Sequence, residues 1–216
     1  MRVWRRRQNW CARAAGGGHR LRPRQADGGA GCFGPVPQGS SGPDLRPGPL
    51  SKARQTLEHA NCQDRAELRL GDGLSVLSAG EVGSIVLAGV SAQTTWEILE
   101  KAPWVFTVGG PRIIMIPATR HSELRRWLWT HGFAFVADRP VQAAGRWYAV
   151  MAAEYTGERH EPTFPECLLG STGSWPEGAG YAAWQKAKLP RMRLGVPDGT
   201  PLADEIDRLL KEGTGL

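Results

Sequence analysis

The sequence predicts an α/β domain whose mainly parallel sheet ends in an antiparallel hairpin. Between residues 44 and 155, short runs of β-branched residues alternate with helical patterns, which is typical of parallel strands joined by crossover helices. Residues 133–137 and 147–154 then give two consecutive strand patterns, close enough in sequence to pair through Gly145. The length of 216 residues suits one such domain with a small appendage.

The elements of the domain follow from apolar runs and apolar periodicity. SIVLA at residues 84–88 and RIIMI at residues 112–116 have the length and composition of buried strands. Leucines four residues apart predict an amphipathic helix over residues 122–131, and Gly132 is suited to end it. The remaining predicted elements are helices over residues 51–60 and 93–101 and a strand over residues 66–70.

Composition divides the chain into three segments. Residues 1–43 are rich in Arg, Gly, Ala and Pro with few large aliphatic side chains, so we expect a disordered or mistranslated segment without a buried strand. Residues 44–155 form the domain. Residues 156–216 are rich in Gly and Pro but contain helical patterns at 179–189 and 202–211, which predict a helical C-terminal extension.

The positive charge belongs to the first quarter of the chain. Residues 1–50 carry nine arginines and two aspartates, a net charge of +7, whereas residues 51–216 carry 18 basic and 19 acidic side chains. A basic arm is typical of nucleic-acid binding. No apolar run approaches the roughly 18 residues that cross a bilayer, and no apolar segment of a secretory signal follows the basic start. We therefore expect a cytoplasmic protein without membrane association.

Open α/β sheets bind ligands beyond the carboxyl ends of their strands, so the loops after the predicted strands are candidate sites. Asp72, between two glycines, offers an acceptor for a ribose hydroxyl or an adenine amine, although Gly-Asp-Gly is also a common tight turn. The small residues at 88–92 leave room for a flat ligand or for close helix packing. Residues 117–121 present Arg120 and His121, which equally suit a solvated helix start.

Four motifs occur in a defined order: PGPLSKA at 47–53, RAELRLGDGL at 65–74, IVLAG at 85–89 and IPATRHSELRRWLWTHGF at 116–133. This order resembles the bacterial tRNA (adenine(22)-N1)-methyltransferase family, a class I S-adenosylmethionine-dependent group. The resemblance covers residues 44–155. It implies a Rossmann-like class I methyltransferase sheet, S-adenosyl-L-methionine as cofactor, and tRNA as the substrate that is methylated at N1 of an adenine.

The resemblance also implies roles for individual residues. Asp44 would hold the cofactor ribose, Asp72 and Gly73 would contact its adenine, and Gly89 and Val90 would line the loop where the target base enters. The substrate-binding residues would be Pro117, Arg120, Arg125 and Arg126, the arginines acting on tRNA phosphates. No metal is expected, because the four cysteines lack zinc-binding spacing. This assignment requires Asp44 and Asp72 to lie side by side on one edge of the sheet.

The chain departs from the family in three places. It has AGVSA at 88–92 where the family has AGMGG, and IPA at 116–118 where the family has QPN. It also has no apolar strand before residue 44, so the sheet is expected to lack its first strand. The GxGxxG match at residues 29–34 follows no strand, which disfavours an NAD oxidoreductase. Two functions stay open: a tRNA methyltransferase, and a catalytically degenerate relative that binds RNA or a protein partner. The sequence does not fix the oligomeric state.

Overall fold

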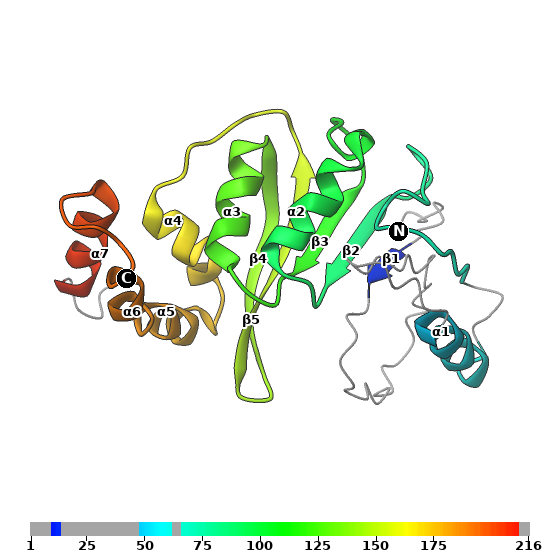
Figure 1. The fold of residues 1–216 in the computed structure, drawn as a ribbon, viewed down its shortest axis with the longest axis horizontal. Helices are drawn as coiled ribbons and strands as arrows, with labels where there is room; N and C mark the ends of the chain where they lie inside the picture. The colour runs from blue at the N-terminus through cyan, green and yellow to red at the C-terminus, as the bar shows by residue number, and fades with distance from the viewer. Residues whose placement is uncertain (1–9, 14–47, 62–65, 212–216) are drawn as a thin grey trace, which may run out of the picture.

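A five-stranded sheet lies at the centre of the computed structural model, which describes residues 10–13, 48–61 and 66–211 (Figure 1). The strands are β1 (Trp10–Arg13), β2 (Ser84–Ala88), β3 (Arg112–Ile116), β4 (Phe133–Ala143) and β5 (Arg146–Tyr155). Their spatial order is β1-β2-β3-β5-β4. The first three strands are parallel, and β5 is antiparallel to both of its neighbours. The predicted α/β sheet with an antiparallel hairpin is therefore confirmed.

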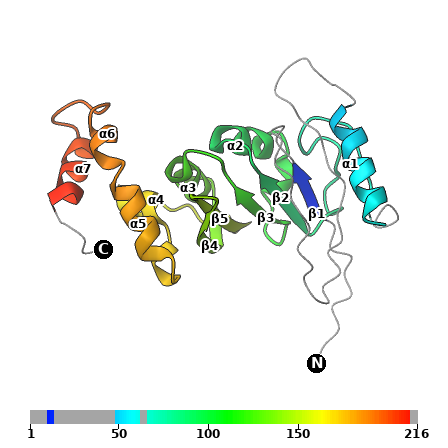
Figure 2. The ribbon, with the colours of Figure 1, turned by 90° about the horizontal axis from the view of Figure 1, so that it is seen from below.

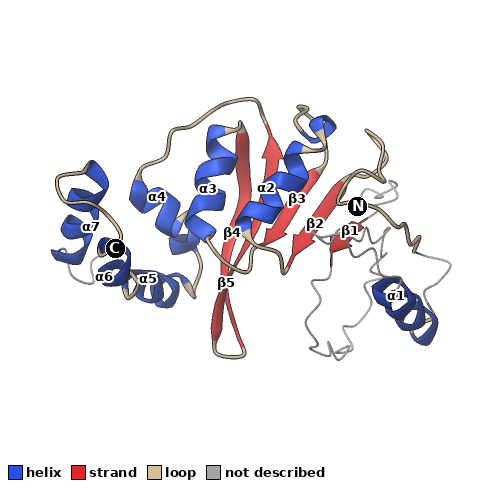
Figure 3. Ribbon diagram, in the orientation of Figure 1, coloured by secondary structure: helices blue, strands red, loops and turns tan. Residues whose placement is uncertain are grey.

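Helices flank the sheet on one face and at both ends. They are α1 (Gly48–His59), α2 (Ala92–Glu100), α3 (His121–Thr130), α4 (Phe164–Leu169), α5 (Gly178–Lys186), α6 (Leu189–Arg193) and α7 (Pro201–Lys211). Viewed from below, α2 and α3 lie on the same side of the sheet, α1 lies beside the β1 end, and α4–α7 extend beyond α3 (Figure 2). The alternation of strand and helix along β2, α2, β3 and α3 is clear in Figure 3.

The core lies between the sheet and helices α2 and α3. Side chains alternate between the two faces of a strand, so Ile85 and Leu87 of β2 and Ile113 and Met115 of β3 point the same way and are buried. They form one cluster with leucines from the helices, namely Leu99, Leu124 and Leu128. The apolar periodicity of 122–131 thus correctly predicts which side of α3 is buried.

The hairpin is longer than the sequence predicts, and its outer strand is irregular. Ala143 pairs with Arg146 across Ala144 and Gly145, both of which have positive φ (49° and 73°), as in a two-residue turn of a β-hairpin. A bulge interrupts the β4 register between Phe135 and Ala137. Further along the same strand lies Pro140, and β4 occupies the edge of the sheet.

Two strand predictions were wrong. Residues 1–43 were expected to contribute no strand, yet Trp10–Arg13 pairs in parallel with β2 and forms one edge of the sheet. Parallel pairing uses backbone N–H and C=O groups, and every residue type except proline supplies both. Conversely, the predicted strand over 66–70 is not formed: only Leu70 makes a bridge, and its side chain is 53% exposed.

The C-terminal extension is helical, as predicted, with two more helices than expected. The pattern at 179–189 is divided into α5 and α6, because Pro190 in the first turn of α6 cannot continue a preceding helix. The Thr163 hydroxyl and the Glu166 carboxylate form a capping box that starts α4. A second apolar cluster, of Leu168, Leu189, Ile206 and Leu209, holds the extension together. No helix among the described residues is long and apolar enough to cross a membrane.

Candidate active site

Two loops meet at the carboxyl ends of β2 and β3, where an open α/β sheet binds its ligand. The Gly89 amide donates to the Ile116 carbonyl at 3.0 Å, and the Ala118 amide donates to the Val90 carbonyl at 2.8 Å. Gly89 is exposed and has φ of 74°, a conformation that favours glycine. The structure therefore brings Gly89 and Val90, from the loop after β2, next to Pro117, from the loop after β3.

Each loop leads directly into a helix. The Ser91 hydroxyl accepts a hydrogen bond from the Thr94 amide at 3.0 Å and caps the N-terminus of α2. Arg120 precedes α3 with φ of 61°, and its exposed guanidinium forms an ion pair with Glu123 at 3.0 Å. Arg120 is thus an accessible cation beside the two loops, which is the position that the predicted phosphate contact requires.

His121 is buried, which overturns the reading of this residue as part of a solvated helix start. Its Nε2 lies 3.2 Å from the Pro117 carbonyl oxygen and its Nδ1 lies 3.1 Å from the Tyr181 hydroxyl of α5. Burial, together with the nearby positive charges of Arg125 and Lys188, lowers the pKa of His121 to about 4. The imidazole is therefore neutral at physiological pH.

The buried imidazole makes the stability of the protein depend on pH. The pKa of His121 is lower in the folded protein than the ordinary value of 6.5, so the unfolded chain binds more protons. Its contribution is fully present above pH 6.5 and is lost as the pH falls toward 4. Between pH 7 and pH 4, we expect the unfolding free energy of the wild type to fall by roughly 2–3 kcal/mol more than that of His121→Gln.

Denaturant unfolding at several pH values would measure this difference. The control is His131→Gln, which makes the same substitution at an exposed imidazole at the end of α3. Parallel pH curves for the wild type and His121→Gln would contradict the prediction.

The structure does not bring Asp72 and Gly73 to the two loops. The Asp72 carboxylate pairs with Lys101 Nζ at 2.9 Å, directly after the last turn of α2, and both side chains are more than half exposed. Gly73 packs against Ile98 in the same half of α2. Since α2 begins at the loop after β2 and its nine residues span about 13 Å, these two residues lie at the opposite end of the helix.

The expected position of Asp72 was wrong because the strand that would carry it to the carboxyl edge is not formed. Asp44 lies outside the described residues. The predicted position of Asp44 therefore stays a prediction. Asp72, its expected neighbour, instead pairs with Lys101 at the far end of α2.

Arg125 does not lie on the surface, so its predicted contact with tRNA phosphate was wrong. Its guanidinium has no exposed area and pairs with Asp138, with Nε–Oδ2 and Nη2–Oδ1 distances of 2.6 and 3.0 Å. Nη1 donates to the carbonyls of Cys167 and Leu168, and Nη2 also donates to Tyr181. Burial opposes the charge of Arg125, but the Asp138 carboxylate and the Tyr181 hydroxyl together outweigh burial and raise the pKa.

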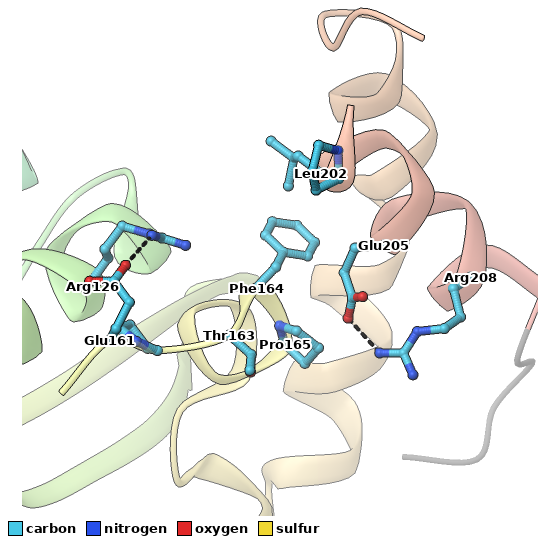
Figure 4. Close-up of a pocket in the computed structure, with 10 residues that line it drawn as sticks. Arg126, Glu161, Thr163, Phe164, Pro165, Leu202, Glu205 and Arg208 are labelled. Atoms are coloured by element: carbon cyan, nitrogen blue, oxygen red, sulfur yellow. Dashed lines mark hydrogen bonds and ion pairs between the residues drawn. The ribbon is translucent and has the colours of Figure 1, made fainter. Parts of the chain in front are cut away.

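Arg126 is exposed but lies away from the two loops. It lines a groove of about 560 Å³ between the segment that starts α4 and helix α7, where Phe164 and Leu202 supply the apolar walls (Figure 4). Both cations of this groove are paired, Arg126 with Glu161 at 3.0 Å and Arg208 with Glu205 at 2.5 Å. The groove is therefore electrically balanced and is separate from the carboxyl edge of the sheet.

Sequence reasoning missed the buried polar network around Arg125. One local signal was available, since His121 and Arg125 are four residues apart and therefore lie on the same face of α3. Leu124 and Leu128 flank this face, so its orientation toward the core could have been expected.

A profile of the methyltransferase domain family matches residues 40–151, which is more than half of the chain. The chain belongs to the methyltransferase domain family. The matched segment ends within β5 and includes both loops of the candidate site.

Among curated proteins, the tRNA (adenine(22)-N(1))-methyltransferase of Bacillus subtilis is 29% identical over 116 residues, or 54% of this chain and 48% of the relative. The chain thus spans about half the length of the curated relative that it matches.

Solved methyltransferases share the fold of this methyltransferase-family chain. A Streptococcus pneumoniae protein assigned as a tRNA (m1A22) methyltransferase, solved with S-adenosyl-L-methionine, superposes with a TM-score of 0.65 and 21% identity, covering 84% of this chain and 80% of its own. The Bacillus subtilis m1A22 tRNA methyltransferase superposes with a TM-score of 0.60 and 20% identity, covering 82% and 76%. These likenesses confirm the Rossmann-like methyltransferase fold.

Proposed function

We propose that the protein transfers a methyl group from S-adenosyl-L-methionine to N1 of an adenine in tRNA. The proposal rests on the two loops at the carboxyl edge of a methyltransferase-family sheet. They are joined by the hydrogen bonds from Gly89 to Ile116 and from Ala118 to Val90. The similarity to the Bacillus subtilis tRNA methyltransferase supports the choice of substrate. A tRNA substrate would place the protein in the cytoplasm.

The cofactor would bind at this edge of the sheet. Gly89 suits such a ligand because it is exposed and its left-handed backbone carries no side chain, and Val90 is buried directly behind it. Asp44 would provide the carboxylate for the ribose hydroxyls. Asp72 and Gly73 are excluded from the proposed site, since Lys101 and Ile98 hold them at the far end of α2. When bound, the cofactor would supply an electrophilic methyl group on a sulfonium.

The target atom determines what the protein must do. N1 of a neutral adenine already carries a lone pair, so no side chain has to remove a proton before methyl transfer. Catalysis then consists mainly of holding two flat molecules in line and excluding water. The small, exposed residues Gly89 and Ala118 leave space for flat groups, and the hydrogen bonds between their loops fix the walls of that space.

The RNA would be held by exposed cations near the loops, with Arg120 foremost. Replacing Arg120 by asparagine, which tolerates positive φ, is expected to weaken tRNA binding about 3- to 10-fold and to reduce the slope of log K against log salt by about one. Arg112→Gln is the matched control, because Arg112 is an exposed cation at the start of β3, on the opposite edge of the sheet. Filter binding at several salt concentrations measures both effects. Equal affinities for Arg120→Asn and the wild type would remove Arg120 from the proposed interface.

The decisive experiment incubates the full chain with S-adenosyl-L-methionine and unmodified tRNA transcripts, followed by nucleoside mass spectrometry. We expect 1-methyladenosine at a single position, and its loss when that adenosine is changed to guanosine. Calorimetric titration with the methyl donor provides the parallel binding measurement. Binding of the donor and of tRNA without any 1-methyladenosine would favour the non-catalytic relative, and absence of donor binding would contradict the proposal.

A further inference from the structure

A chain of buried hydrogen bonds connects the helical extension to the loop after β3. It runs from Asp138 of β4 through Arg125 of α3 to the hydroxyl of Tyr181 in α5, and then through His121 to the carbonyl of Pro117. All four side chains of this network are less than one tenth exposed. The loop that it reaches is the one whose Ala118 amide is bonded to Val90.

The donors and acceptors of the network admit a single arrangement around Tyr181. The hydroxyl accepts from Arg125 Nη2 at 3.3 Å and from Gln185 Nε2 at 2.9 Å, which uses both lone pairs. The orientation of the Gln185 amide is fixed, because its nitrogen also faces the Leu168 carbonyl and its oxygen accepts from Lys188 Nζ. The Tyr181 proton can then only be donated to His121 Nδ1.

This arrangement determines which ring nitrogen of His121 carries the proton. Since Nδ1 accepts a hydrogen bond, the proton of the neutral ring is on Nε2 and is donated to the Pro117 carbonyl. Tyr181 also stacks parallel to the His121 ring, with centroids 6.3 Å apart and an interplanar angle of 6°. The extension therefore fixes the orientation of the imidazole, and the imidazole holds Pro117, the first residue of the loop after β3.

We infer that Tyr181 and His121 are positioning residues, through which the C-terminal extension sets the geometry of the loop after β3 against the loop after β2. The inference rests on the proposed function for its effect on catalysis, but the structural coupling can be tested without any substrate. Burial and the surrounding cations Arg125 and Lys188 keep the imidazole neutral, so the coupling operates throughout the physiological pH range.

The test compares Tyr181→Phe, which retains the buried ring and removes only the hydroxyl, with Tyr148→Phe, which removes a hydroxyl from β5 outside the network. Hydrogen exchange of the Ala118 amide reports the loop after β3, and exchange of the Leu77 amide, bonded to Leu74 in a turn before β2, reports opening elsewhere in the domain. We expect Tyr181→Phe to accelerate exchange at Ala118 about 10-fold relative to Leu77. Tyr148→Phe should leave this ratio unchanged. An unchanged ratio in Tyr181→Phe would overturn the inference, whether or not the protein methylates RNA.

Kinetics test the catalytic consequence. Tyr181→Phe should lower kcat for methyl transfer about 10- to 100-fold, with a smaller change in the KM for the methyl donor, because the network acts on the loop after β3 whereas the proposed cofactor contact, Gly89, lies in the loop after β2. His121→Gln keeps an N–H near the Pro117 carbonyl and should retain more activity than His121→Leu. Wild-type kcat in Tyr181→Phe, despite faster exchange at Ala118, would overturn the catalytic role. An inactive wild type would instead contradict the proposed function and leave the exchange result to decide the coupling.

Discussion

Replacing Asp138 by asparagine is expected to lower the unfolding free energy by about 3–5 kcal/mol, because it leaves the Arg125 guanidinium buried without a counter-charge. The five N–H donors of this guanidinium all have partners, and two of those partners are the Asp138 oxygens. Asparagine has nearly the same shape, so no cavity contributes, and the loss combines the missing charge with an amide NH2 that faces an Arg125 N–H. Urea unfolding followed by far-UV circular dichroism measures the change.

The matched control for this prediction is Asp198→Asn. Asp198 also pairs with an arginine, Arg193, but its side chain is 92% exposed, and pairs of this kind contribute little to stability. We expect no measurable change in its unfolding midpoint. An Asp138→Asn protein as stable as Asp198→Asn would show that Arg125 does not depend on its carboxylate partner.

The second large effect is expected for Gly170→Ala, at the end of α4. Gly170 has φ of 58° and ψ of −147°, a region that only glycine occupies readily, and a methyl group there would overlap the Asp138 carboxylate and Arg125 Nε. Backbone strain and displacement of the ion pair together should cost about 2–5 kcal/mol. Thermal unfolding of the purified variant tests this.

Gly199→Ala separates the two causes of that loss. Gly199 also has positive φ, 75°, but a methyl group at this position would meet nothing within 4 Å. Its substitution should therefore cost only the backbone strain, about 1 kcal/mol. If both variants lose the same stability, contact with the ion pair contributes nothing to the effect at Gly170.

The elements that local sequence specifies were predicted well. Strands β2 and β3 are short apolar runs, α3 has leucines at a helical spacing, and Gly145 supplies the positive φ of the hairpin turn. In each case the residues that determine the element lie within it. The loops after β2 and β3 could be located for the same reason, because they are simply the ends of correctly predicted strands.

The errors concern features that depend on distant partners. A strand exists only beside a neighbouring strand, which the local sequence does not contain. The local pattern therefore predicted a strand at 66–70 that is not formed. It also missed the strand Trp10–Arg13, which pairs with residues more than 70 positions away. Arg125 is buried because Asp138 and Tyr181 reach it from other elements, 13 and 56 residues along the chain. Asp72 was assigned by its motif, and its actual partner is Lys101.

The irregular outer strand of the hairpin has a consequence for the behaviour of the protein at high concentration. An edge strand with a regular row of free amide groups can recruit a strand from another molecule and begin an aggregate. In β4, the register shift at Val136 disrupts that row, and Pro140 has no amide hydrogen to offer. This border of the sheet is therefore a poor template for intermolecular β-pairing.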